Sequence, residues 1–246
     1  MKTILAALAL AVSAGSVSAA KTRLVEPQLK LEAHEKAEGA KPRVALTFDA
    51  CSGKTDERIL STLIDNNIPA TIFVTARWLK RNGATLARLK ARPNLFEIEN
   101  HGAMHVPAVD QVVSIYGIGA AGSPAAVEAE VAGGAAAISA EGLTSHWFRG
   151  ATAKYSLSAI GQIRRMGFRI AGYSINGDGG SLLGAAQAER HIARAKDGDV
   201  IIAHINQPTH EAGVGVVRGI LDLKAKGFEF VRLDDATEDG SDDTVN

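Results

Sequence analysis

Short apolar runs alternate with longer amphipathic stretches along the chain after Pro42. The runs are rich in valine, isoleucine and phenylalanine, which is typical of strands that are buried on both faces. We therefore predict seven strands, at residues 44–47, 71–74, 96–98, 146–148, 169–175, 200–203 and 228–233.

Most of the intervening stretches have the apolar spacing of amphipathic helices. The alanine-rich stretch has the clearest start, because Ser123 can cap a helix and Pro124 suits its first position. Ser52 and Thr55 are the side chains expected to cap the first helix. The predicted helices span residues 56–66, 77–90, 123–140, 157–166, 185–195 and 214–226.

Strands that alternate with helices favour parallel β–α units in one α/β domain. The pattern alone leaves open whether the sheet closes into a barrel or stays open. In both forms the chemistry lies beyond the carboxyl ends of the strands, so the residues at those ends are the candidates for a functional site.

The segments outside this alternation differ from it in composition. Residues 1–20 combine Lys2, an apolar run and a small-residue cleavage pattern at 17–20, which predicts a secretory signal and export to a bacterial periplasm. Residues 21–42 are expected to form an arm that leads to the domain. Residues 234–246 carry many acids and no basic residue, which predicts a solvated acidic tail.

The overall composition narrows the class of partner. Lysine plus arginine and aspartate plus glutamate both number 27, and no basic stripe with interleaved aromatic residues occurs, so we expect no nucleic-acid partner. No later run is apolar enough to span a bilayer, so we expect no stable membrane insertion. Cys51 is the only cysteine, which excludes an internal disulfide and leaves stability to the core. The oligomeric state stays open.

Two histidines follow the third predicted strand. His101 and His105 are four residues apart, so on a helical turn both imidazoles would reach one cation. The alternative is a pair of exposed loop histidines. Their place at a strand end favours the metal site.

An aspartate and an arginine, which carry opposite charges, follow two other strands. Asp49 comes directly after Phe48, where burial and a nearby cation would set its protonation state. Arg149 also ends a strand, and its guanidinium can hold Asp49 ionised and oriented. A purely structural ion pair is the alternative.

His204 ends the strand predicted at 200–203 and can protonate a leaving amine when a carboxylate supports it. Asp178 is the expected partner and Asn176 the competitor. The glycine-rich residues 177–180 are interpreted as a tight turn. His210 is expected near the same groove, and three other histidines are interpreted as structural or exposed: His34, His146 and His191.

Five segments in this order resemble the five motifs of the NodB-homology polysaccharide deacetylases, a family of the carbohydrate esterase type. The segments are Thr47-Phe48-Asp49, His101-x-x-x-His105, Phe148-Arg149, 172–178 and 201–204. The resemblance covers roughly residues 42–233. It implies a distorted (β/α) barrel, which agrees with the strand count, so we predict a single-domain barrel of about seven strands at 43–233.

The resemblance also implies an activity, the metal-assisted removal of an acetyl group from an N-acetylated amino sugar. The expected substrate is peptidoglycan or another envelope glycan, and the expected cofactor is a divalent metal, with zinc preferred. The matching positions are Asp49 for the base, His204 for the acid, Arg149 and Asp178 for the groups that tune them, and His101 and His105 for the metal ligands.

The chain departs from the family pattern at three places. Ala50 stands where the family has a second aspartate in the metal site, so we expect weaker metal binding that Ala50→Asp would restore. Cys51 either offers a thiolate or is a buried thiol. Residues 150–155 replace a proline-rich loop, and Gly179 replaces a tryptophan, which implies a wider or different substrate groove.

Two other classes of function stay open. One is a glycan-binding barrel with impaired catalysis, and the other is a metal-free amidohydrolase of the same fold that acts on a small amide. The presence of Asp49, Arg149 and His204 together favours the enzyme, because binding alone needs no acid–base pair.

Overall fold

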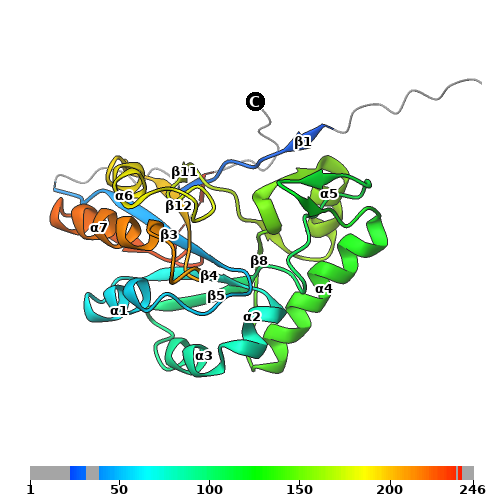
Figure 1. Ribbon diagram of the computed structural model, residues 1–246, viewed down its shortest axis with the longest axis horizontal. Helices are drawn as coiled ribbons and strands as arrows, with labels where there is room; N and C mark the ends of the chain where they lie inside the picture. Colours follow the sequence, from blue (N-terminus) through cyan, green and yellow to red (C-terminus); the bar gives the residue numbers. More distant parts are fainter. Residues whose placement is uncertain (1–22, 32–38, 237, 240–246) are drawn as a thin grey trace, which may run out of the picture.

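The apolar runs form a curled, mainly parallel sheet with helices packed around it (Figure 1). The computed structural model describes residues 23–31, 39–236 and 238–239. Its strands are β1 Leu24–Val25, β2 Lys30–Leu31, β3 Arg43–Ala50, β4 Ala70–Val74, β5 Phe96–Asn100, β6 Ser114–Ile115, β7 Ile118–Gly119, β8 Trp147–Phe148, β9 Tyr155–Ser156, β10 Arg169–Ile170, β11 Ile175–Asn176, β12 Asp199–His204, β13 Glu229–Val231 and β14 Glu238–Asp239. Its helices are α1 Glu57–Asp65, α2 Ala76–Arg81, α3 Gly83–Lys90, α4 Pro124–Ala140, α5 Leu157–Arg165, α6 Ala185–Ala193 and α7 Ala212–Ala225, with a 3₁₀ turn at Ala151–Ala153.

Parallel strands make up the curl, in the order β10, β8, β5, β4, β3, β12 and β11. The strand β13 joins the start of β3 as a further parallel neighbour. Because β3 and β12 pair from Val44 to Asp49, their ends bring Asp49 and His204 into register. The predicted α/β class and single barrel-like domain are confirmed.

One chain segment links the two edges of this sheet. The strand predicted at 169–175 is in fact two strands, since β10 pairs with β8 and β11 pairs with β12 at the opposite edge. Between them, Gly172 lies so close to the arm that an added Cβ would be 2.3 Å from the carbonyl oxygen of Pro27. The barrel is therefore distorted, and its hydrogen bonding is interrupted around Gly172.

The side chains of β3 divide between two cores. Alternate residues from Val44 to Ala50 join the larger core between the sheet and the helices. Ala45 joins a smaller core inside the curl. Because side chains alternate along a strand, Thr47 and Asp49 also point inward. The inner side of β3 thus carries the polar residues and the outer side the packing residues.

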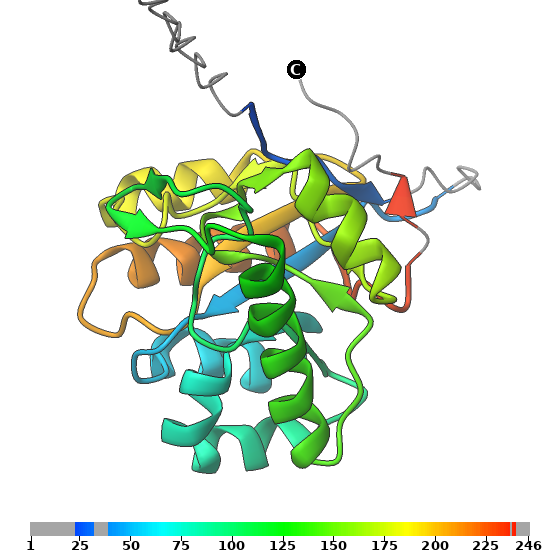
Figure 2. The ribbon, with the colours of Figure 1, turned by 90° about the vertical axis from the view of Figure 1, so that its right-hand side faces the viewer.

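The helix α4 starts as predicted and packs tightly against the sheet. The Ser123 hydroxyl accepts a hydrogen bond from the Ala126 N–H at 3.2 Å, and Pro124 is the first helical residue. An added Cβ at Gly134 would lie 2.1 Å from the side-chain oxygen of Asn100, at the end of β5. Glycine at this position therefore lets α4, in front in Figure 2, approach the loop after β5.

The helix predicted at 77–90 is two helices, α2 and α3. Asn82 ends the first and starts the second. Its side-chain amide donates to the carbonyls of Trp78 at 3.0 Å and Gly53 at 3.1 Å. These contacts hold the break between the two helices against the loop that follows β3.

The cap expected for α1 is wrong. Asp56 caps this helix, because its carboxylate accepts from the Arg58 N–H at 3.1 Å and also binds the Arg58 guanidinium. Thr55 instead bonds to Thr85 at 3.1 Å. Asp49 is therefore not the cap of α1, as we expected. The capping residue is Asp56, however, and not Ser52 or Thr55.

The sheet extends into the expected arm and tail. The strand β1 pairs with β9, and β2 pairs with both β12 and β14. Val25, Leu29 and Leu31 are buried, so this part of the arm belongs to the fold. Asp234 bonds to Arg169 at 2.6 Å, so the tail begins packed. The predicted signal at 1–20 lies outside the described residues. Within the described part of the chain, no helix is long and apolar enough to cross a membrane.

Candidate active site

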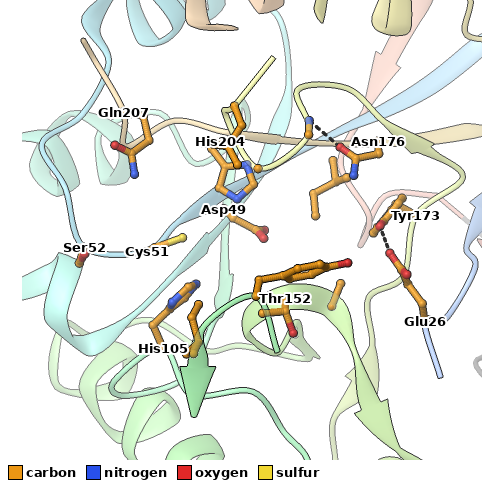
Figure 3. A pocket seen from close by; sticks show the side chains of 17 residues that line it. Glu26, Asp49, Cys51, Ser52, His105, Thr152, Tyr173, Asn176, His204 and Gln207 are labelled. Carbon is orange, nitrogen blue, oxygen red and sulfur yellow. Dashed lines mark hydrogen bonds between the residues drawn. The ribbon is translucent and has the colours of Figure 1, made fainter. Parts of the chain in front are cut away.

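The carboxyl ends of the central strands open into a pocket of about 560 Å³ (Figure 3). Three of the predicted site residues line it: Asp49, His105 and His204. The others are fully buried and contact this wall: His101, Arg149 and Asp178. Side chains predicted from separate segments of the sequence thus converge at one end of the sheet.

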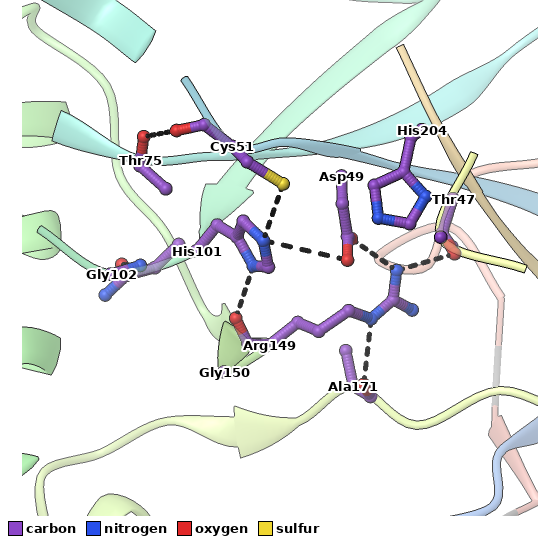
Figure 4. Close-up of polar contacts among 12 residues, drawn as sticks. Thr47, Asp49, Cys51, Thr75, His101, Gly102, Arg149, Gly150, Ala171 and His204 are labelled. Carbon is purple, nitrogen blue, oxygen red and sulfur yellow. Dashed lines mark hydrogen bonds and ion pairs between the residues drawn. The ribbon is translucent and has the colours of Figure 1, made fainter. Parts of the chain in front are cut away.

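Asp49, the penultimate residue of β3, has its two carboxylate oxygens toward different partners (Figure 4). Oδ1 accepts a hydrogen bond from Arg149 Nη1 at 3.0 Å. Oδ2 lies 3.7 Å from His101 Nε2. The arginine therefore orients the carboxylate while one oxygen stays turned toward the histidines and the pocket.

Arg149 is fixed by the interruption in the barrel. Its Nε donates to the Ala171 carbonyl at 3.1 Å and its Nη2 to the Gly172 carbonyl at 3.0 Å. Nη1 also donates to the Thr47 hydroxyl at 2.9 Å, and the guanidinium lies 4.3 Å from the centre of the Phe73 ring. The carbonyls of Ala171 and Gly172, which are left without a strand partner, thus hold the guanidinium that orients Asp49.

His204, at the end of β12, is supported by Asp178. Its Nδ1 lies 3.1 Å from Asp178 Oδ1, and its backbone N–H donates to Asp178 Oδ2 at 2.6 Å. Asn176 does not compete, because its side-chain oxygen accepts from the Gly179 N–H at 2.8 Å. With Nδ1 donating to Asp178, His204 presents Nε2 as the other proton-carrying position.

His101 and His105 lie on a loop, so the helical turn expected for them is wrong. Gly102 and His105 have φ angles of 89° and 64°, and these left-handed residues fold the loop back on itself. The two ring centres are 5.0 Å apart. His101 Nδ1 donates to the Arg149 carbonyl at 2.6 Å, which leaves Nε2 as its free nitrogen.

Glu130 of α4 supports this loop, although no pattern in the sequence singles this residue out. One oxygen of its buried carboxylate accepts from the backbone N–H groups of Met104 at 3.0 Å and Val106 at 2.9 Å. Met104 and Val106 flank His105. The carboxylate therefore holds the backbone on both sides of a predicted metal ligand.

Ala50 does not face the histidines. Its side chain is fully buried in the outer core with the other outward residues of β3. Cys51, the next residue, lines the pocket, and its Sγ is 3.6 Å from His101 Nε2. The carboxylate ligand that we expected from Ala50→Asp does not fit this backbone, because it would point into the apolar core.

One ligand atom from each of Cys51, His101 and His105 lies within 4.8 Å of the other two. Imidazole and sulfur are the donors that zinc and related cations prefer in proteins. The residues present therefore fit a divalent cation of this kind.

The proposed acid and base have opposite shifts in pKa. Burial opposes ionisation of Asp49, but the positive charges of His101, Arg149 and His204 outweigh it and lower the pKa of Asp49. Burial disfavours the charged form of His204, yet Asp178 outweighs it and raises the pKa of His204 well above its usual value. Asp49 is thus ionised and His204 protonated at neutral pH.

The thiol and the first histidine also influence each other. Burial raises the pKa of Cys51, but hydrogen bonds with His101, His105 and His204 outweigh it and hold this pKa well below its usual range. Burial lowers the pKa of His101, and Asp49 with Cys51 reverses this. Cys51 and His101 thus each favour the charged form of the other.

Three further residues shape the pocket and were not predicted. Glu26 comes from the arm, bonds to the Tyr173 hydroxyl and forms an ion pair with Lys154 at 3.2 Å. Tyr116 lines the opening with 76% of its surface exposed. Thr152 also lines the pocket, and its backbone is left-handed, with a φ of 67°. Its buried hydroxyl has no hydrogen-bond partner among the described residues.

The remaining histidines lie elsewhere. His210 is not among the residues that line the pocket, but its Nδ1 donates at 2.8 Å to the carbonyl of Ser181, whose chain neighbours Gly180 and Leu182 line it. His146 is exposed and bonds to Asp234, and His191 bonds to the Asn176 carbonyl. His34 lies outside the described residues. The glycines at 179 and 180 have positive φ, which agrees with the predicted tight turn.

The curled α/β sheet brings three features together at its strand ends: an oriented aspartate, a supported histidine and a compact donor cluster. Together they define a hydrolase of the barrel type. The model of the polysaccharide deacetylase family matches residues 36–171. The chain belongs to this family of hydrolases, which act on acetyl amides and acetyl esters of carbohydrates. The match contains the positions of Asp49, His101, His105 and Arg149 but ends before Asp178 and His204.

Solved structures show the same fold. A family 4 acetyl xylan esterase from Clostridium thermocellum in complex with a cobalt ion is 26% identical, with a TM-score of 0.62 over 78% of this chain and 89% of that one. A structure described as T48 deacetylase with substrate is 23% identical, with a TM-score of 0.63 over 79% and 89%. A family pseudoenzyme from Bacillus anthracis is 18% identical, with a TM-score of 0.63 over 79% of this chain and 65% of that one. No curated protein matches the chain.

Proposed function

We propose that this protein removes acetyl groups from N-acetylated amino sugars of an envelope glycan. One observation carries the proposal. Asp49 and His204 stand in register at the ends of two paired strands. Each has its own charged support, which is Arg149 for the aspartate and Asp178 for the histidine. A binding protein needs no such pair, whereas amide hydrolysis needs a base for water and an acid for the amine.

The base step follows from the state of Asp49. Its lowered pKa keeps the carboxylate ionised, and Arg149 holds its Oδ1, so Oδ2 accepts the proton of the water that attacks the acetyl carbonyl. A divalent cation held by His101 and His105 would polarise that carbonyl and stabilise the developing negative charge. Arg149 prevents rotation of the carboxylate during the step.

The acid step follows from the state of His204. Asp178 accepts from Nδ1 and raises the pKa of the imidazole, so the ring carries a second proton on Nε2 at neutral pH. That proton passes to the amine nitrogen when the carbon–nitrogen bond breaks. The products are acetate and a free amino sugar.

The pocket wall supports a sugar substrate. The exposed ring of Tyr116 offers a flat apolar face, and Glu26, Asn176 and Gln207 offer hydrogen-bonding groups around the opening. Sugars combine apolar ring faces with hydroxyl groups, which such a lining satisfies. The exposed Leu182 lines the pocket near the position of the missing tryptophan.

We also propose export to a periplasm, on the basis of the signal-like composition of residues 1–20. An envelope glycan is reached only from that side. Fractionation of cells that express the full chain tests the location, and a protein that stays with its N-terminal segment in the cytoplasm contradicts it.

A second candidate is a glycan-binding barrel with impaired catalysis. Two observations favour it, the alanine at position 50 and the likeness to a Bacillus anthracis pseudoenzyme of the same family. A mutant of that protein is described as having restored enzymatic activity, so loss of activity within this fold is known. Glycan binding without release of acetate would support this candidate.

The test is acetate release from chitin oligomers and from peptidoglycan, with metal content measured on the same samples. Asp49→Asn and His204→Ala are each expected to lower turnover by about a hundredfold or more. Asp65→Asn, an exposed aspartate at the end of α1, is the matched control and should leave turnover unchanged. Full activity in either site variant contradicts the mechanism.

A further inference from the structure

The inner side of β3 carries polar groups at every second residue. Thr47 bonds to Arg149, Asp49 lies at the pocket, and Cys51 follows in the same alternation. Ala50 occupies the outward position between them. The chain therefore has a donor beside the histidines, displaced by one residue from the position at which we expected a carboxylate.

The distances around Cys51 suit a shared cation. In a tetrahedral zinc site with ordinary metal–sulfur and metal–nitrogen bonds, a sulfur and a nitrogen ligand lie about 3.6 Å apart. The separation of Cys51 Sγ and His101 Nε2 is 3.6 Å. The ligand atoms of Cys51, His101 and His105 all lie within 4.8 Å of one another, so a small movement of His105 completes the set.

The orientation of His101 leaves the correct nitrogen free. Its Nδ1 is committed to the Arg149 carbonyl at 2.6 Å, so Nε2 is the atom that faces Cys51. A metal-binding histidine typically donates its other N–H to a backbone carbonyl or carboxylate in this way. Glu130 gives the loop of His105 a comparable support.

Asp49 is not needed as a ligand. Its Oδ1 is held by Arg149 at 3.0 Å, and its Oδ2 is the oxygen required for proton transfer. If Asp49 were bound to the cation through Oδ2, the proposed base would be lost. A sulfur ligand from Cys51 supplies the third donor and leaves this carboxylate free.

We infer that the Cys51 thiolate, with His101 and His105, is a protein ligand of the metal and that the site therefore selects thiophilic cations. Cobalt, zinc and cadmium fit this donor set, whereas magnesium and calcium prefer oxygen ligands. Metal binding forms a metal–sulfur bond and displaces to solvent the proton that Cys51 Sγ and His101 Nε2 share at 3.6 Å. This inference rests on the proposed metal-assisted function, but it concerns the ligand and not the turnover.

The experiment is a titration of the metal-free full-length protein with Co²⁺, followed by near-ultraviolet absorption. Cys51 is the only cysteine of the chain, so a sulfur-to-cobalt charge-transfer band can report no other thiol. We expect this band to saturate at one ion per chain, Zn²⁺ and Cd²⁺ to displace it, and Mg²⁺ in large excess to leave it unchanged. Because wild-type protein is used, the result does not depend on the folding of a variant.

Two variants sharpen the assignment. Cys51→Ser is expected to lose the band and to bind Zn²⁺ about tenfold or more weakly. Asp49→Asn is the matched variant, because it changes the neighbouring inward residue, and it is expected to keep the band while it loses turnover. Loss of the band in Asp49→Asn would show that the carboxylate is a ligand and overturn the division of roles.

The outcomes separate this inference from the proposed function. Tight cobalt binding to the wild type without a sulfur band overturns the inference, even if acetate is released. A full band without acetate release from any acetylated glycan supports the inference and overturns the proposed function. Acetate release that resists complete metal removal overturns the metal-assisted step of the proposed mechanism, whereas the sulfur band alone decides whether Cys51 is a ligand.

Discussion

Asp178 binds His204 twice, through the backbone N–H at 2.6 Å and through Nδ1 at 3.1 Å. The first contact fixes the end of β12 against the turn that follows β11, and the second fixes the tautomer of the ring. Asp178 is fully buried, so its charge acts on His204 with little screening by water. One carboxylate therefore sets both the position and the protonation state of the proposed acid.

Asp178→Asn is expected to shift the alkaline limb of the pH profile of kcat/KM to lower pH. Burial lowers the pKa of His204 and Asp178 raises it well above its usual value, so the protonated ring persists above pH 6.5 in the wild type. Loss of the negative charge lets this pKa fall, and the acid is deprotonated earlier as the pH rises. Asparagine can still accept a hydrogen bond from the backbone, which keeps the position of His204.

The acid limb of the same profile is the internal control. It belongs to protonation of Asp49, whose pKa is lowered by His101, Arg149 and His204 against the effect of burial. This limb should lie below the usual range of an aspartate and move little in Asp178→Asn. An alkaline limb that does not move would remove Asp178 from the role of supporting the acid.

Glu130→Ala is expected to weaken metal binding by about ten- to a hundredfold, as loss of an outer support usually does. The Glu130 carboxylate accepts from the backbone on both sides of His105, and no other side chain does so among the described residues. Without it, the left-handed backbone at His105 loses its restraint. Isothermal titration calorimetry with Zn²⁺ measures the change in affinity.

Glu128→Ala is the matched control for this variant, because Glu128 lies on the exposed side of the same helix. It removes the same kind of side chain without touching the loop. Equal zinc affinities in the two variants would mean that the His105 loop holds its shape without Glu130.

The convergence of the site could be predicted from sequence because parallel strands align their carboxyl ends. Asp49, Arg149 and His204 each follow an apolar run, and this placement alone brings them to one edge. The inward alternation at Thr47, Asp49 and Cys51 was also visible in the sequence. From this alternation, Cys51 and not Ala50 could have been predicted to lie beside the histidines.

The supports of the site could not be predicted in this way. Glu26 and Glu130 reach the pocket and its loop from segments remote in sequence, and nothing in their local pattern distinguishes them from solvated glutamates. The loop of His101 and His105 depends on left-handed backbone angles, one of them at a histidine. The split of the strand at 169–175 also depends on which edges pair, which is a property of the tertiary fold.

Ala50→Asp is expected to destabilise the protein by about 3 kcal/mol or more instead of tightening metal binding. The new carboxylate would enter the outer core, where Ala50 is fully buried and the neighbouring outward residues of β3 are apolar. Urea unfolding at neutral pH measures the loss. Ala50→Asn, of similar size but without charge, should lose less. A stable Ala50→Asp with higher zinc affinity would show that the end of β3 can turn this position toward His101.

Glu99→Gln is expected to remove a pH-dependent part of the unfolding free energy. Burial raises the pKa of Glu99 to about 9, and the negative charge of Glu97 adds to this. The folded protein therefore keeps the proton of Glu99 between about pH 4.5 and 9, whereas the unfolded chain loses it. Since the unfolded state binds fewer protons in this range, the stability from this group is complete below pH 4.5 and declines as the pH rises toward 9.

Glutamine reproduces the neutral form of Glu99 at every pH. Its side-chain oxygen can still accept from the backbone N–H groups of His146 and Trp147, which bond to Glu99 at 2.9 and 2.7 Å. The variant and the wild type should therefore have similar stability near pH 5, and the variant should become the more stable of the two as the pH approaches 9. Urea unfolding of both proteins across this range measures the difference. A constant difference between the two curves would mean that Glu99 is ionised in the folded protein.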